Sequence, residues 1–140
     1  MLQLLAHLAG DYLLQSEAMS ENKRSSSAWA GFHAVTYSLP FLLLDPSWAA
    51  WGMIWGSHFL IDRFGLARYV VWAKNIVLGQ WPKRLCGGVS TADDRQRFSW
   101  NNCKLTGYPS EVQHWLAGML IIVADNTLHL CINWASLKWL

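Results

Sequence analysis

Residues 28–61 read AWAGFHAVTYSLPFLLLDPSWAAWGMIWGSHFLI, and this stretch decides the fold. It holds a single formal charge, Asp45. Residues 112–137 likewise hold one, Asp125, whereas residues 74–111 hold nine. Apolar blocks near the length of a bilayer span, about 20 residues, joined by a charged segment are typical of a membrane protein. We therefore predict an all-α, polytopic membrane bundle of about four helices, with residues 1–140 forming a single membrane domain.

The composition of the 140 residues excludes several other classes. The chain is 53% apolar and 14% charged, whereas an ordinary soluble domain carries roughly 25% charged residues. A compact soluble helical domain stays as the alternative. The net charge of +2 comes without a long basic run, so we expect a lipid bilayer and no nucleic acid as partner. Three cysteines without a CxxC pair read as free thiols: Cys86, Cys103 and Cys131.

Apolar runs and helix breakers place the four helices. They are expected over residues 2–15, 28–44, 47–74 and 112–139. The first is short for a full span, the second contains Pro40, and Ser47 is the expected N-cap of the third. The part of the third block beyond Phe64 could instead be a basic amphipathic helix on the inner surface. Residues 79–110 are expected to form a polar loop with little fixed structure.

The cations set the orientation of the predicted spans. Placing residues 16–27 and 63–111 in the cytoplasm puts ten of the eleven Lys and Arg residues inside. Both termini should then lie outside. Tryptophans stand where the membrane interfaces would be, and an aromatic belt is favoured over packing in the core: Trp29, Trp48, Trp51, Trp134 and Trp139.

Every predicted span carries a line of polar residues. Three pairs of a histidine and an acid stand four residues apart: His7 and Asp11, His58 and Asp62, and Asp125 and His129. This spacing puts both side chains of a pair on one helix face. His33 and Tyr37 repeat the interval in the second block. Because burying ionisable groups in hydrocarbon costs several kcal/mol, these side chains should face the bundle interior and meet at one polar centre.

A centre of imidazoles and carboxylates is a ligand set for a divalent metal. Zn²⁺ is the first expectation, with Mn²⁺ or Fe²⁺ as alternatives, and bundle cores assemble ligands from facing helices. The candidate metal ligands are His7, Asp11, His33, His58, Asp62, Asp125 and His129. Two other interpretations stay open: metal-free pairs that join helices, and a proton or ion conduit.

A bound metal in this place favours a membrane-bound, metal-dependent hydrolase. In this interpretation, His7, His33, His58 and Asp125 are the ligands. The catalytic candidates are Asp11 and Asp62, either of which would orient an imidazole or act as general base. A lipid-linked or phospholipid substrate would suit the location. A non-enzymatic structural or interaction protein is the alternative, and four short spans with little buried surface suggest a homo-oligomer.

Three segments resemble, in order, the motifs of an uncharacterised bacterial and phage membrane-protein family, domain of unknown function 3307. They are HLAGDYLLQSEAMSENK at residues 7–23, HFLIDRF at 58–64 and DNTLHL at 125–130. The resemblance implies a multipass protein of the bacterial inner membrane and, for a phage-encoded member, a host envelope protein as partner. The positions matching the family's polar motifs are His7, Asp11, Gln15, His33, His58, Asp62, Asp125 and His129.

One position departs from the family pattern. The last motif reads Asp125-Asn126 where Asp-Gln is expected. The shorter amide puts in doubt any role that depends on a long side chain there.

Overall fold

The structure is a computed structural model that describes the backbone of residues 1–85 and 92–140 and the side chains of residues 1–78 and 95–140. All regular elements in this part of the chain are helical, which confirms the predicted all-α class. In chain order they are α1 (Leu2–Leu8), η1 (Ala9–Leu13), α2 (Glu17–Asn22), α3 (Ser27–Ser38), η2 (Leu39–Leu44), α4 (Trp48–Phe64), α5 (Leu66–Leu85), α6 (Ala92–Arg97), α7 (Trp100–Cys103) and α8 (His114–Trp139).

Contacts along the chain divide it into two compact units. Unit 1 comprises Met1–Gly65 and Asn126–Leu140, and unit 2 comprises Leu66–Asp125. The composition of the sequence showed no boundary at Gly65, and the sequence analysis treated the chain as one domain.

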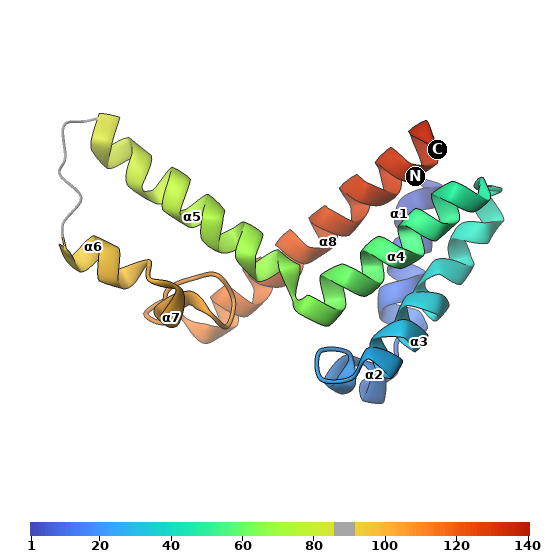
Figure 1. Cartoon of the computed structure of the whole chain (residues 1–140), viewed down its shortest axis with the longest axis horizontal. Helices are drawn as coiled ribbons and strands as arrows, with labels where there is room; N and C mark the ends of the chain where they lie inside the picture. Colours follow the sequence, from blue (N-terminus) through green and yellow to red (C-terminus); the bar gives the residue numbers. More distant parts are fainter. Residues whose placement is uncertain (86–91) are drawn as a thin grey trace. The chain divides into compact units, whose positions relative to one another are not determined.

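Unit 1 is built around the pair α3 and α4, which lie side by side (Figure 1). The N-terminus of α4 is capped as the sequence predicted, because the Ser47 hydroxyl accepts a hydrogen bond from the Ala50 N–H at 3.0 Å. Helix α4 ends at Gly65, which adopts the left-handed conformation with φ 59°. Helix α1 packs against η2, and η1 packs against α3.

Two expected helix boundaries in unit 1 were wrong. The third block was predicted as one helix over residues 47–74, but Gly65 separates α4 from α5. The second block was predicted as one helix over residues 28–44, but α3 gives way to the 3₁₀ helix η2 at Leu39, next to Pro40. Proline lacks the N–H that an α-helix needs and clashes with the preceding turn, which explains the change.

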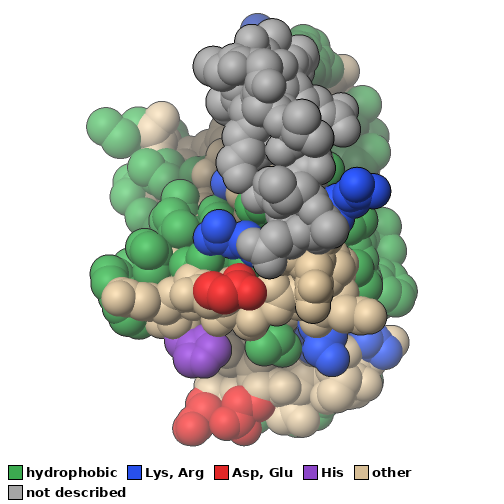
Figure 2. All heavy atoms as spheres, turned by 90° about the vertical axis from the view of Figure 1, so that its left-hand side faces the viewer, with side chains coloured by type: hydrophobic (Ala, Val, Ile, Leu, Met, Phe, Trp, Pro, Cys, Tyr) green, Lys and Arg blue, Asp and Glu red, His purple; other side chains and the backbone are tan. Residues whose placement is uncertain are grey.

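The prediction of an irregular loop over residues 79–110 was also wrong for the described residues. Helix α5 continues to Leu85, and α6 and α7 follow within unit 2. The sequence of α6, ADDRQR, is polar on every side, so it lacked the apolar periodicity on which the prediction relied. Figure 2 shows that both hydrophobic and charged side chains are exposed on the side of the molecule that it draws.

The residues between α7 and α8 are fixed to α5. Gly107 has φ 79°, and a Cβ at this position would lie 2.8 Å from the backbone nitrogen of Trp72. The Asn75 side chain donates a hydrogen bond to the Gly107 carbonyl at 2.9 Å. This segment is therefore held in place by a close backbone contact that only glycine allows.

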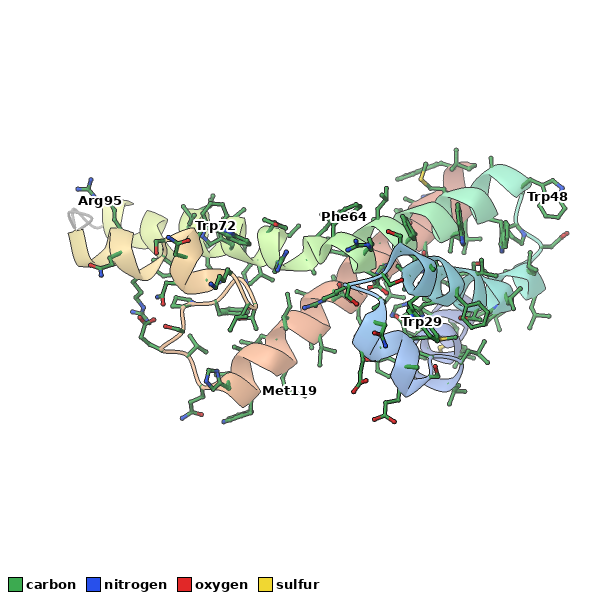
Figure 3. The ribbon with its side chains drawn as sticks, turned by 60° about the horizontal axis from the view of Figure 1, so that its bottom comes forward. Trp29, Trp48, Phe64, Trp72, Arg95 and Met119 are labelled. Atoms are coloured by element: carbon green, nitrogen blue, oxygen red, sulfur yellow. The ribbon has the colours of Figure 1, made fainter. Side chains whose placement is uncertain are left out.

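Unit 1 buries polar side chains and exposes apolar ones. Its fully buried side chains include His7, His33, His58, His129 and Asn133. Large apolar side chains of the same unit are exposed, among them Leu43 of η2 at 89% and Trp48 of α4 at 83%. Figure 3 shows Trp48 and Phe64 pointing away from the helices of unit 1. The buried polar side chains lie in the same unit as a small apolar core of Ala6, Tyr37, Phe41 and Ile54. Histidines that are fully buried are the less usual part of this distribution, because His is of intermediate burial in most proteins.

Helix α8 is the described helix that is long and apolar enough to cross a membrane, by its length and composition. The four-span topology stays a prediction. Of the five tryptophans expected at an interface, Trp29, Trp48, Trp134 and Trp139 are exposed. The Trp51 indole instead donates a hydrogen bond to the Ser38 carbonyl at 3.1 Å.

Two of the three cysteines are described, and both are free thiols, as predicted: Cys103 is buried and Cys131 is exposed. Burial raises the pKa of the Cys103 thiol, which keeps it protonated and unreactive. Cys86 lies outside the described residues.

Candidate metal centre

The sequence places Asp11 in the centre of unit 1 through an unusual turn. Residues Ala9–Leu13 form a π-helical turn, in which the Leu14 N–H donates to the Ala9 carbonyl at 3.0 Å. Turns of this kind occur frequently at functional sites. Gly10 lies against α3 so closely that a Cβ there would be 2.7 Å from the Tyr37 ring. The π-turn and the glycine together bring the Asp11 carboxylate to the imidazoles of α3 and α4.

Two buried imidazoles meet at this carboxylate. The Nε2 atoms of His33 and His58 are 3.0 Å apart. The Oδ1 atom of Asp11 is 3.4 Å from the Nε2 of His33 and 3.5 Å from the Nε2 of His58. Among the described residues, these three ligand atoms form one of two groups that could hold a metal ion. We call Asp11, His33 and His58 the first ligand group.

The second ligand group consists of His58, Asp62 and His129. The Oδ2 atom of Asp62 is 3.2 Å from the Nε2 atoms of both His33 and His58. Its Oδ1 atom is 3.7 Å from the Nε2 of His129, whose Nδ1 is 3.2 Å from the Nδ1 of His58. The two groups therefore share His58, and all their members lie in unit 1.

A lysine directly contacts Asp62 of the second ligand group. The Lys23 ammonium is 2.9 Å from the Asp62 Oδ2 and donates a hydrogen bond to the Gln15 side-chain oxygen at 2.9 Å. The side chain of Lys23 is 19% exposed, whereas that of Asp62 is 4% exposed. Lys23 thus connects the buried centre with the surface of unit 1, because its side chain is partly exposed. The sequence analysis used Lys23 only to orient the spans and missed this contact.

His7 is held in a hydrogen-bond network beside the first ligand group. Its Nε2 is 2.9 Å from the Asn126 amide oxygen, which can only accept, and its Nδ1 is 2.8 Å from the Tyr37 hydroxyl. The Tyr37 oxygen accepts from the Asn133 side chain at 2.6 Å. A neutral His7 with its proton on Nε2 satisfies all these contacts. His7 therefore belongs to neither ligand group, although its Nδ1 is 3.5 Å from Asp11.

The network also uses Asn126, the position at which the resemblance led to the expectation of a longer amide. The Asn126 nitrogen donates to the Tyr12 hydroxyl at 2.7 Å while its oxygen contacts His7. The shorter side chain thus reaches two partners.

Six of the seven candidate ligands predicted from the sequence converge. His7 lies beside the two ligand groups. The other five belong to them: Asp11, His33, His58, Asp62 and His129. The seventh, Asp125, belongs to neither group and lies in unit 2. Tyr37 was noted for its spacing from His33, but its ring also stacks on His58 with centroids 3.5 Å apart. The spacing of residues along the sequence did not indicate this contact, because Tyr37 and His58 lie on different helices.

Residues 1–78 match the family described as protein of unknown function (DUF3307). The chain belongs to this family. The match confirms the resemblance noted from the polar motifs within residues 1–78, and the motif at residues 125–130 lies outside it. The DUF3307 match covers the whole first ligand group together with Asp62 and Lys23, and it ends before His129. Comparison with curated proteins and with solved structures finds no match.

Proposed function

We propose that this chain is a membrane-embedded, metal-dependent hydrolase whose divalent ion is held by Asp11, His33 and His58. The observation that carries the proposal is the spacing of their ligand atoms, 3.0–3.5 Å. Ligands bound tetrahedrally to Zn²⁺ at the usual lengths stand about 3.3 Å from one another. Three ligand atoms of the right chemistry thus lie where three corners of a zinc tetrahedron require them.

The donor set favours Zn²⁺. Two imidazole nitrogens and one carboxylate oxygen are the ligand types of catalytic zinc sites, which keep the fourth position open. Mn²⁺ and Fe²⁺ accept the same donors and stay as alternatives. When bound, such an ion supplies the Lewis acidity that lowers the pKa of a neighbouring water.

Asp62 is the residue best placed to act as general base. It lies beside the first ligand group, with its Oδ2 3.2 Å from both imidazoles. A carboxylate there can accept the proton of the attacking water. Asp11, the other catalytic candidate from the sequence, is assigned to metal binding because Asp62, which faces the same two imidazoles, already contacts the Lys23 ammonium.

The distribution of polarity in unit 1 supports a membrane location. Apolar side chains on the outside and imidazoles inside suit a helix bundle in lipid, where ionisable groups turn toward protein. Helices α3 and η2 together rise about 30 Å, close to the thickness of the hydrocarbon layer. We propose a multipass protein of the bacterial inner membrane with both termini outside. A phospholipid or lipid-linked ester is the matching substrate class.

Metal content tests the ligand assignment. The full chain is purified in detergent, stripped with a chelator, reloaded with Zn²⁺, desalted and analysed for elements. We expect stoichiometric zinc in the wild type and at least tenfold less in His33→Ala and His58→Ala. His114→Ala is the matched control, because His114 is an exposed histidine outside both ligand groups. Folded wild-type protein that takes up no metal would overturn the proposal.

Hydrolysis needs a separate test. Zinc-loaded protein is incubated with phospholipids and lipid-linked esters in mixed micelles, and product release is measured. Asp62→Asn should lower turnover by about 10²–10⁴-fold, the usual contribution of a general base, while the zinc bound by the first ligand group is retained. Equal turnover in wild type and Asp62→Asn would remove Asp62 from the mechanism.

A metal-free structural centre is the second candidate. It is favoured by the network of His7, Tyr37, Asn126 and Asn133, which is satisfied without an ion. In that case Tyr37→Phe should destabilise chelator-treated protein by about 1–3 kcal/mol, because buried partners are left without a hydrogen bond. Zinc would then leave the thermal midpoint of the wild type unchanged.

A further inference from the structure

The two ligand groups differ in one respect, which is the charge already in contact with them. Asp11 of the first group faces only histidines among its described charged partners, whereas Asp62 of the second group contacts the Lys23 ammonium at 2.9 Å. Each group offers one carboxylate to neutralise a cation. In the second group, the Asp62 carboxylate already contacts a cation, the Lys23 ammonium.

From this difference we propose that Lys23 takes the place of a second metal ion, so that the centre holds one ion, in the first ligand group. The inference rests on the proposed metal site and adds its stoichiometry. Paired metal ions in hydrolases stand about 3.5–4 Å apart and usually share ligands. The carboxylate of Asp62 is the ligand that two ions could share here, because its two oxygens face different partners. Its Oδ2 faces the imidazoles of His33 and His58, and its Oδ1 faces His129.

The position of Lys23 is fixed from two sides. Its Nζ donates to Gln15, which follows η1, and contacts Asp62 on α4. Two partners from different elements therefore fix the position of the Lys23 ammonium. A solvated lysine side chain that meets an acid by chance would have no such fixed position. The ammonium contacts the same oxygen, Oδ2, that faces the Nε2 of His58.

Charge balance favours a single ion. Two carboxylates, Asp11 and Asp62, carry −2, and one divalent ion with Lys23 carries +3. A second divalent ion beside Lys23 would raise the positive charge to +5 against the same two carboxylates, whereas two ions without Lys23 would carry +4, with one carboxylate for each ion. Repulsion between like charges at low dielectric is strong, so the lysine and a second ion exclude each other.

The experiment counts ions per chain. Detergent-purified full-length protein is stripped, titrated with Zn²⁺ by calorimetry, and analysed for elements after desalting. Wild type should bind one zinc per chain. Lys23→Met and Lys23→Gln should bind two, because Asp62 becomes available, and the double variant Lys23→Met/Asp62→Asn should return to one. Lys23→Arg keeps the charge and should stay at one, as should the control Lys138→Met.

The outcomes separate the two proposals. No zinc in the wild type would overturn the metal site itself and the inference with it. One zinc in the wild type with one zinc also in Lys23→Met and Lys23→Gln would leave the first ligand group standing and overturn the role of Lys23. Two zinc ions in the wild type would overturn it as well. Folding of each variant is checked by circular dichroism, and the two neutral variants at position 23 serve as replicates.

Discussion

At the scale of single residues, the position of Asp11 depends on the glycine before it. Gly10 lies where a Cβ would be 2.7 Å from both the ring and the backbone oxygen of Tyr37. Backbone atoms on α3 cannot move aside as a flexible side chain could. The approach of η1 to α3, and with it the contact of Asp11 with His33, therefore requires glycine.

Gly10→Ala should separate η1 from α3. We expect a loss of about 1–3 kcal/mol in the free energy of unfolding, as for an overpacked core, and at least tenfold weaker zinc binding. Gly31→Ala is the control, because a Cβ on Gly31 in α3 meets nothing within 4 Å. That variant should be stabilised by up to about 1 kcal/mol through helix propensity, with zinc binding intact. Denaturant unfolding and zinc titration of both variants check this, and equal zinc affinity would contradict it.

At the scale of elements, unit 2 is organised by the contact of residues 104–110 with α5. Gly107 combines a positive φ with a close approach to α5. Lys74 and Asn75 of α5 reach back to Tyr108 and Gly107 with hydrogen bonds of 3.0 and 2.9 Å. Residues from both sides of this contact thus hold the segment in place.

Gly107→Ala should release this segment from α5. Alanine is disfavoured at this position by the left-handed backbone conformation and by the atoms of α5 that its Cβ would meet. We therefore expect a destabilisation of about 1–3 kcal/mol. Faster amide exchange at residues 104–110 and at α5 is the measurement. Zinc binding at unit 1 should persist, because every ligand lies in that unit. Gly118→Ala, whose Cβ would meet nothing within 4 Å, should exchange like the wild type.

At the scale of the whole molecule, a bound ion should couple to stability. A ligand that binds only the folded state stabilises it by mass action, about 2.7 kcal/mol at 100 times the dissociation constant. Zinc should therefore raise the thermal midpoint of the detergent-solubilised wild type, and a chelator should lower it. His58→Ala should respond to neither. A midpoint of the wild type that is independent of zinc would argue against a metal centre.

The exposed apolar side chains should keep the chain in the membrane. Leu43, Trp48 and Leu13 are at least 80% exposed, and large exposed apolar areas mark contacts with membranes or other proteins. After expression in bacteria, the protein should stay in the membrane fraction through an alkaline carbonate wash and dissolve only in detergent. A monomer that is soluble without detergent would contradict the membrane location.

The sequence by itself determined the helical class, the polar centre and most of its members. Four-residue spacing fixed which side chains share a helix face, and the cost of burying charge required these faces to meet, so Asp11, His33, His58, Asp62 and His129 could be named in advance.

The tertiary structure decided which of them form a ligand group. His7 and Asp125 have the same spacing as the others, but neither belongs to a ligand group. The hydrogen bonds of His7 with Asn126 and Tyr37 give its imidazole another role. Spacing along one helix says nothing about distances between helices. The contact of Lys23 with Asp62 spans 39 positions of sequence, and no local pattern encodes it.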